Sequence, residues 1–202
     1  MIKFKRRIGS AFLACMMLLS LLPVTALAAD TANNEMGISY SFEQALRKAL
    51  GNEAPEPDAE LTIEDCQKLT GKLDLSNEGI TEIGGYDYTA KGKVYGWDEL
   101  REDEQNILTA KDSGKDTTWW GISSIGRALI NVTELDLSDN KIEFIPTIFL
   151  LGNPSIEKVT LPEGVKAIGV SGTNADGTWA WGYKAFAHMK SLTTINIPDS
   201  VE

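Results

Sequence analysis

The chain has 202 residues, enough for one ordinary domain with a sizeable hydrophobic core. It carries 29 acidic and 19 basic residues, a formal net charge of −10. An acidic excess of this size repels the phosphate backbone of nucleic acids and the surface of anionic membranes, so the composition argues against both as partners.

The first 29 residues have the order of a secretory signal peptide. A basic head at positions 3–7 precedes an apolar run at 11–22, and small residues follow at 26–29. The apolar run is shorter than the ~20 residues that a membrane-spanning helix requires. We therefore expect cleavage after Ala28 or Ala29, a secreted or cell-surface protein, and no membrane insertion once the signal is removed.

Removal of this segment makes the chain more acidic. Four of the 19 basic residues and none of the 29 acidic residues lie in it, which leaves 15 basic residues and a net charge of −14. Cys66 is then the sole cysteine, so no intramolecular disulfide can form. Small secreted eukaryotic domains usually depend on disulfides, whereas bacteria often export proteins without them, and this favours a bacterial source.

Residues 30–70 predict two helices. Apolar residues with helical spacing run from Phe42 to Leu50, and Gly51 is a typical stop. After a proline-rich loop, Thr62 and Asp65 can cap a second, short helix.

Two patterns recur in residues 71–202. The first, L-D-L-S followed by two isoleucines, occupies 73–83 and returns 62 residues later at 135–145. The second occupies 156–165 and returns 36 residues later at 192–201, and the two patterns meet at an offset of 24. A unit of roughly 20–29 residues is typical of leucine-rich repeats. The longer offsets then indicate insertions, which we place at about 86–121 and 170–183.

The L-x-L core of such a unit is a short strand whose alternate side chains point inward. One unit buries too few aliphatic side chains to offset the conformational entropy lost on ordering it, at roughly 1–2 kcal/mol per residue. Stacking on neighbouring units is therefore required, which predicts a solenoid.

Two stretches resemble known families. Ile168-Gly169, Ala185-Phe186 and 191–201 resemble the BspA-type leucine-rich repeats of bacterial surface proteins, in which I-G-x-x-A-F precedes s-L-t-x-I-x-I-P-x-s-V. The chain departs from that pattern where 170–183 interrupts it, and where Met189 replaces a common cysteine. Residues 30–70 are similar to the helical cap of internalin-like proteins. These resemblances imply an α/β solenoid: a right-handed leucine-rich-repeat coil with short parallel strands, a helical N-terminal cap and irregular insertions.

Alternate strand residues would then form a concave face of polar side chains, as expected of a contact surface. The resemblance suggests an extracellular protein or glycan as the ligand. The residues predicted for this face are Lys72, Asp74, Glu134, Asp136, Lys158, Thr160, Thr194 and Asn196.

The insertions contain a group of aromatic residues with two interpretations. Exposed aromatic rings stack on sugars or anchor a protein partner, whereas buried ones would seal an insertion against the solenoid. Both interpretations stay open from the sequence. The residues are Trp119, Trp120, Trp179, Trp181 and Tyr183.

Residues 98–110 predict a helix with Leu100, Ile107 and Leu108 on its apolar side. Its acidic cluster from Glu99 to Glu104 is interpreted as a solvated helix face rather than as paired catalytic carboxylates or metal ligands, because no apolar pocket accompanies it in the sequence.

Few residues suit catalysis. His188 is the single histidine and lies in the repeats, whereas Cys66 lies in the cap, so a Cys-His pair would have to join opposite ends of the solenoid. Residues 174–178 faintly resemble a calcium loop, but Gly172 stands where the first aspartate is required. We expect no enzyme activity, no metal and no cofactor.

The sequence thus predicts an exported leucine-rich-repeat module that binds a protein or glycan at the bacterial cell surface. The chain stops at Glu202, one residue after the last repeated valine and without a polar cap. This supports an alternative, in which the repeats are incomplete and form the N-terminal part of a longer secreted enzyme or adhesin. It also predicts self-association through the uncapped repeat.

Overall fold

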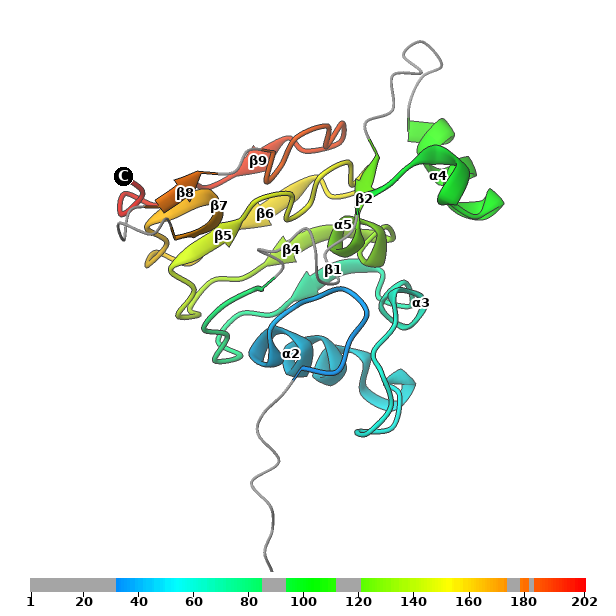
Figure 1. Ribbon diagram of the computed structural model, residues 1–202, viewed down its shortest axis with the longest axis horizontal. Helices are drawn as coiled ribbons and strands as arrows, with labels where there is room; N and C mark the ends of the chain where they lie inside the picture. Colours follow the sequence, from blue (N-terminus) through cyan, green and yellow to red (C-terminus); the bar gives the residue numbers. More distant parts are fainter. Residues whose placement is uncertain (1–31, 85–93, 112–120, 174–178, 182–183) are drawn as a thin grey trace, which may run out of the picture. The chain divides into compact units, whose positions relative to one another are not determined.

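The structure is a computed structural model, and Figure 1 shows its ribbon. It describes residues 32–84, 94–111, 121–173, 179–181 and 184–202. The predicted signal peptide and the side chains of Trp119, Trp120 and Tyr183 lie outside these residues. The described part combines helices with a four-stranded parallel sheet, so the α/β class predicted from the sequence is confirmed.

Two helices occupy the N-terminal part. Helix α2 (Tyr40–Leu50) begins after Ser39, whose hydroxyl accepts a hydrogen bond from the Phe42 amide at 3.2 Å, and ends at Gly51, where φ is 56°. A 3₁₀ turn, η1 (Gly51–Glu53), follows. Helix α3 (Ile63–Cys66) begins with a capping box between Thr62 and Asp65. Both helices lie where the sequence predicts them.

A buried ion pair fixes the loops around α2. The Glu43 carboxylate accepts from Arg47 Nε at 2.8 Å and from Asn34 Nδ2 at 2.8 Å, and Arg47 Nη2 donates to the Ala59 carbonyl at 2.7 Å. Because a buried charge is costly unless it is paired and hydrogen-bonded, this network ties α2 to the segments before and after it.

The main sheet contains β1 (Gly71–Asp74), β4 (Val132–Asp136), β6 (Lys158–Thr160) and β9 (Thr194–Ile195), in that order and all parallel. Its inward row pairs Leu73 with Leu135, Leu135 with Val159, and Val159 with Ile195. These partners are 62, 24 and 36 residues apart, the offsets at which the sequence patterns recur. The register expected from the recurrence is therefore the register of the sheet.

A second sheet contains β5 (Phe144–Pro146), β7 (Ala167–Thr173) and β8 (Trp179–Trp181). Strand β5 pairs with β7 in parallel, and β7 pairs with β8 antiparallel. The insertion predicted at 170–183 therefore begins inside a strand, and its described residues extend the sheet. A two-stranded antiparallel ladder joins β2 (Val94–Tyr95) to β3 (Ile122–Ser123).

The segment predicted as the first insertion contains a 3₁₀ turn, η2 (Trp97–Glu99), and helix α4 (Glu102–Lys111). The helix predicted at 98–110 therefore begins at Glu102 instead. Leu100 has an extended backbone, and the Arg101 amide donates to the Glu104 carboxylate at 2.8 Å, which caps the helix one turn later than predicted. As predicted, Leu100 and Leu108 are buried. They form a small core with Ile122 of β3 and with Ile130, which follows shortly after. Helix α5 (Ser124–Ala128) follows β3, capped by the Ser123 hydroxyl.

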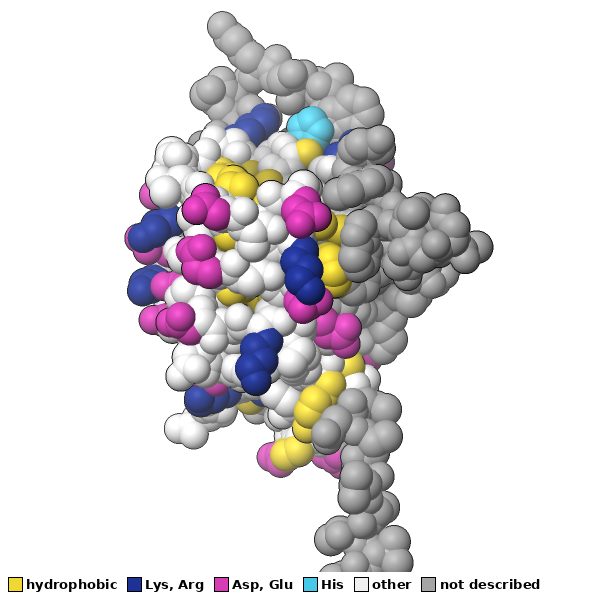
Figure 2. All heavy atoms as spheres, turned by 90° about the vertical axis from the view of Figure 1, so that its left-hand side faces the viewer, with side chains coloured by type: hydrophobic (Ala, Val, Ile, Leu, Met, Phe, Trp, Pro, Cys, Tyr) yellow, Lys and Arg dark blue, Asp and Glu magenta, His cyan; other side chains and the backbone are white. Residues whose placement is uncertain are grey.

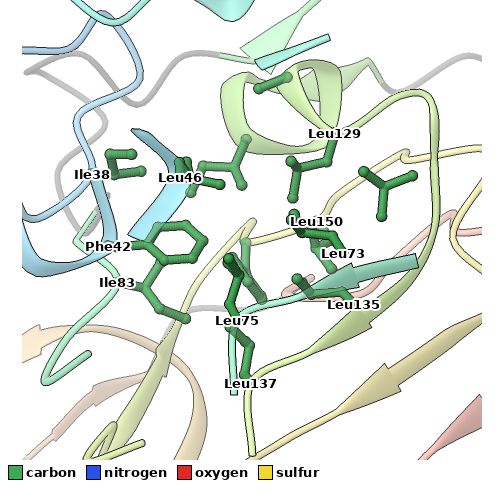
Figure 3. Packing of buried hydrophobic residues seen from close by; sticks show 14 of the residues in the cluster. Ile38, Phe42, Leu46, Leu73, Leu75, Ile83, Leu129, Leu135, Leu137 and Leu150 are labelled. Carbon is green, nitrogen blue, oxygen red and sulfur yellow. The ribbon is translucent and has the colours of Figure 1, made fainter. Parts of the chain in front are cut away.

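The main hydrophobic core lies between α2, α5 and the strands, as Figure 3 shows for Phe42, Leu46, Leu73 and Leu135. Each such side chain contributes about 1.5–3 kcal/mol through burial. In Figure 1, α2 and α3 lie beside β1, at one edge of the main sheet. The helices thus cover the edge that β1 would otherwise expose.

Several non-glycine residues adopt the left-handed conformation, and they recur with the sequence patterns. Asn77 and Asp139, 62 residues apart, have φ of 54° and 58°. Ile148 and Lys184, 36 residues apart, have φ of 52° and 74°. A left-handed isoleucine is rare enough to suggest strain. The positive φ recurs at the aligned Lys184, so this backbone turn recurs together with the sequence pattern.

Candidate binding surface

The main sheet presents a row of polar side chains beside its buried leucines. In β1 the burial alternates from exposed Lys72 to buried Leu73 to exposed Asp74, and β4 and β6 repeat this alternation around Leu135 and Val159. We call this surface the polar strand face. It contains Lys72, Asp74, Glu134, Asp136, Lys158, Thr160, Thr194 and Asn196.

Register brings these predicted residues into two rows. Lys72 pairs with Glu134, Glu134 with Lys158, and Lys158 with Thr194 across the four strands. In the second row Asp74 pairs with Asp136, and Asp136 pairs with Thr160. The structure therefore brings together side chains that lie more than a hundred residues apart in the sequence.

Lys72 lies between two carboxylates. Its Nζ atom is 3.5 Å from Asp74 Oδ2 and 3.8 Å from Asp136 Oδ2. The Lys72 and Asp74 side chains are about half exposed, at 53% and 54%. Water screens such a pair, so it contributes little stability and a ligand can displace it at little cost.

The two aspartates are held in the same way. Asp74 Oδ1 accepts from the Ser76 amide at 3.1 Å and from its hydroxyl at 2.7 Å, and Asp136 accepts from Ser138 at the same two distances. The Ser76 hydroxyl is the largest cause of the lowered pKa of the Asp74 carboxyl, followed by the Ser76 amide. Each aspartate thus closes the turn after its own strand while its second oxygen faces Lys72.

The Asn196 side chain bonds to the backbone of a neighbouring segment. Its Oδ1 accepts from the Leu161 amide at 2.6 Å, and its Nδ2 donates to the Leu161 carbonyl at 3.0 Å. The side chain therefore satisfies the backbone just beyond β6, where the short β9 has ended. The structure thus adds a role in completing the β6–β9 pairing, and the role of Asn196 in ligand contact stays a prediction.

Four side chains of the face make no hydrogen bond or ion pair to another described residue. Two of them, Glu134 and Lys158, are register partners. Lys158 and Thr194 are exposed, and Glu134 and Thr160 are half-buried. This set combines a cation, an anion and two hydroxyl groups, which suits a polar ligand.

The predicted aromatic contacts are only partly described. Trp179 and Trp181 belong to β8, where they pair with Thr173 and Val170 of β7. Trp119, Trp120 and Tyr183 lie outside the described residues. The choice between sugar stacking and sealing an insertion stays open.

The interpretation of the acidic cluster as a solvated face is wrong at one position. Glu99, Glu102 and Asp103 are exposed, but Glu104 is fully buried. Its carboxylate accepts from Arg127 Nε at 2.7 Å and from Gln67 Nε2 at 2.8 Å. These partners lie 23 and 37 residues away in the sequence, and helical spacing gives no signal for them.

The two residues considered for catalysis lie in different parts of the described chain. The Cys66 thiol is buried at the end of α3, and burial raises its pKa to about 12, which makes it a poor nucleophile. His188 lies on the exposed loop before β9. Among the described residues, no three histidine, cysteine or acidic side chains are grouped as metal ligands. None of the described helices is long and apolar enough to cross a membrane.

On the face in Figure 2, acidic and basic side chains are interspersed, and hydrophobic side chains form small separate areas. That face carries no continuous basic patch of the kind that binds nucleic acid. No protein-family model, no curated protein and no solved structure matches the chain.

Proposed function

We propose that the chain is an exported leucine-rich-repeat protein that binds a protein or glycan at the bacterial surface through the polar strand face. The observation that carries the proposal is the register of the main sheet, in which Leu73, Leu135, Val159 and Ile195 are successive partners. Strands β4 and β6 are neighbours in one sheet, and β5 and β7 are neighbours in another. This alternation is what a coil of stacked repeats requires.

The sequence around β4 supports the repeat class. Residues 132–142 read V-T-E-L-D-L-S-D-N-K-I, which fits the pattern L-x-x-L-x-L-x-x-N-x-L at each apolar position and at Asn140. Asn140 is buried, and its amide bonds to backbone atoms of two successive units. An asparagine in this role explains why the pattern requires that residue type.

The chemistry of the polar strand face supports ligand binding over catalysis. It offers a cation at Lys158, an anion at Glu134 and hydroxyl groups at Thr160 and Thr194, all on rigid strands. Polar side chains fixed by a sheet are pre-organised, so little conformational entropy is lost when a ligand binds. Such a surface recognises polypeptide polar groups or sugar hydroxyls.

The experiment is binding of the purified chain to arrays of bacterial and host glycans and of extracellular proteins. Once a partner is found, Glu134→Lys and Thr160→Arg are compared with wild type by calorimetry. We expect each variant to weaken binding by roughly tenfold or more, the effect of losing about 1.4 kcal/mol at an interface.

The matched control is Glu163→Lys, which makes the same charge change on an exposed loop residue beyond β6. It should bind as wild type does, and all three variants should keep the wild-type melting temperature. Wild-type affinity in both face variants would contradict the assignment of the face, and a chain that binds no partner on either array would contradict the proposed function.

A further inference from the structure

The buried carboxylate of Glu104 joins three segments. It accepts from Arg127 Nε and Nη2 at 2.7 and 2.8 Å, in the paired geometry that makes arginine–carboxylate bonds strong. It also accepts from Gln67 Nε2, just after α3, and from the Arg101 amide, just before α4, both at 2.8 Å. Helix α4 is thus tied to the N-terminal helices and to α5 through one side chain.

Arg127 and Arg101, which bond to Glu104, also contact β2 and the end of α3. The Arg127 guanidinium lies over the Tyr95 ring, 4.6 Å from its centroid, so it holds β2 as well as α4. Arg101 donates to Gln67 Oε1 at 2.6 Å and to Glu64 at 2.7 Å. Strand β2 and the start of α4 therefore share one charged network centred on Glu104.

Within the described part of the chain, the segment also has apolar and backbone attachments. Leu100 and Leu108 pack against Ile122 and Ile130 in a core separate from the main one, with Tyr95 and Ile107 beside it, and Tyr95 packs against the main core as well. Between the described strands, the backbone link is the two-residue ladder of β2 and β3. Segments with few buried apolar contacts open at lower free energy than the core to which they attach.

We propose that residues 94–111 are a flap that opens as a unit while the main sheet stays folded, and that the Glu104 carboxylate is the latch that keeps it closed. Opening leaves Arg127 without its counter-charge and exposes Ile122 and Ile130 to water. The flap therefore switches the molecule between a closed polar surface and an apolar one beside α5. This conformational device is independent of the polar strand face.

Hydrogen exchange of the full chain, followed by mass spectrometry, tests the proposal. In Glu104→Gln the amides of α4 should exchange at least about tenfold faster than in wild type, because the half-buried Arg127 guanidinium loses its carboxylate partner. The amides of β4 and β6 should exchange at the wild-type rate. The matched control is Glu102→Gln, an exposed residue of the same helical turn, which should leave all rates unchanged.

The double variant Glu104→Gln with Arg127→Met removes both charges of the pair, and it should restore part of the protection of α4. Unchanged exchange of α4 in Glu104→Gln would overturn the latch, and equal acceleration in α4, β4 and β6 would overturn the separate flap. If Glu104→Gln fails to fold, the test is hydrogen exchange of wild-type amides measured at a series of low urea concentrations. The proposal requires α4 to open at lower urea than the sheet, and identical urea dependence would refute it.

Discussion

The side-chain amide of Asn140 donates to the carbonyl of Leu75 at 2.8 Å, although the two residues are 65 positions apart. The same Nδ2 donates to the Leu137 carbonyl at 2.9 Å, and Oδ1 accepts from the amides of Glu78 and Ile80 at 3.1 and 3.0 Å. One buried side chain thus satisfies backbone groups in the loops after both β1 and β4, where strand pairing has ended.

Replacement of Asn140 by alanine should therefore destabilise the fold strongly. It leaves several buried backbone groups without a partner, and each such group costs about 1–3 kcal/mol. We expect the free energy of unfolding to fall by at least about 2 kcal/mol, measured as a lower urea midpoint. Asn106→Ala, an exposed position in α4, is the control, and an equal loss there would contradict the role of Asn140.

Replacement of Ser76 by alanine should raise the pKa of the Asp74 carboxyl toward its usual value. The Ser76 hydroxyl stabilises the ionised carboxylate, and its loss removes the largest cause of the lowered pKa. Carbon-detected NMR titration of Asp74 measures the change. The equivalent variant Ser138→Ala should leave the pKa of Asp74 unaltered, since Ser138 bonds to Asp136. A rise in both variants would show a general effect on the sheet.

The arrangement of the main sheet could be predicted because its cause is local. Side chains alternate along a strand, so L-x-L places two leucines inward, and a one-residue slip would bury Asp74 or Asp136. The recurrence of that pattern at fixed offsets then determines which strands are neighbours. The same reasoning identified the polar strand face, since its residues are those between the leucines.

The roles of Glu104 and Asn196 could not be predicted in this way. Each depends on a partner that only the folded chain brings close: Arg127 for Glu104, and the Leu161 backbone for Asn196. A charged residue in an acidic run is usually solvated, and nothing local indicates that one of four is buried. Asn140 did have a signal in the sequence, because its spacing from the leucines fits the asparagine of the leucine-rich-repeat pattern that we propose for this segment.

Replacement of His188 by glycine should stabilise the protein slightly. His188 has φ of 58°, and the aligned position 36 residues earlier is Gly152, with φ of 73°. A left-handed residue with a side chain costs roughly 1–2 kcal/mol, whereas added glycine entropy in the unfolded chain costs less. We expect a gain of about 0.5 kcal/mol in the free energy of unfolding. Lys190→Gly, two residues on and without a positive φ, should instead destabilise the chain.

Closure of the 94–111 flap should depend on pH through Glu104. Burial raises the pKa of this carboxyl, but bonds from Arg127, Gln67 and the Arg101 amide outweigh it, so the pKa is lowered on folding. The charged groups near it are Arg127 of α5, Arg101 and Asp103 before and in α4, and Glu64 of α3.

A group whose pKa is lowered on folding stabilises the folded state above its unfolded pKa, about 4.3 for glutamate, and this stabilisation is lost as the pH falls through the folded value. Wild-type α4 should therefore stay protected from hydrogen exchange at neutral pH and lose protection below about pH 4, once intrinsic exchange rates are corrected for pH. In Glu104→Gln, protection of α4 should be low throughout and should fall less with acid than it does in wild type. Because Asp65 and Asp103 also have lowered pKa values, acid weakens both proteins generally, and the difference between them isolates Glu104. Parallel loss of protection in wild type and Glu104→Gln between pH 7 and 3 would show that Glu104 does not carry the acid response.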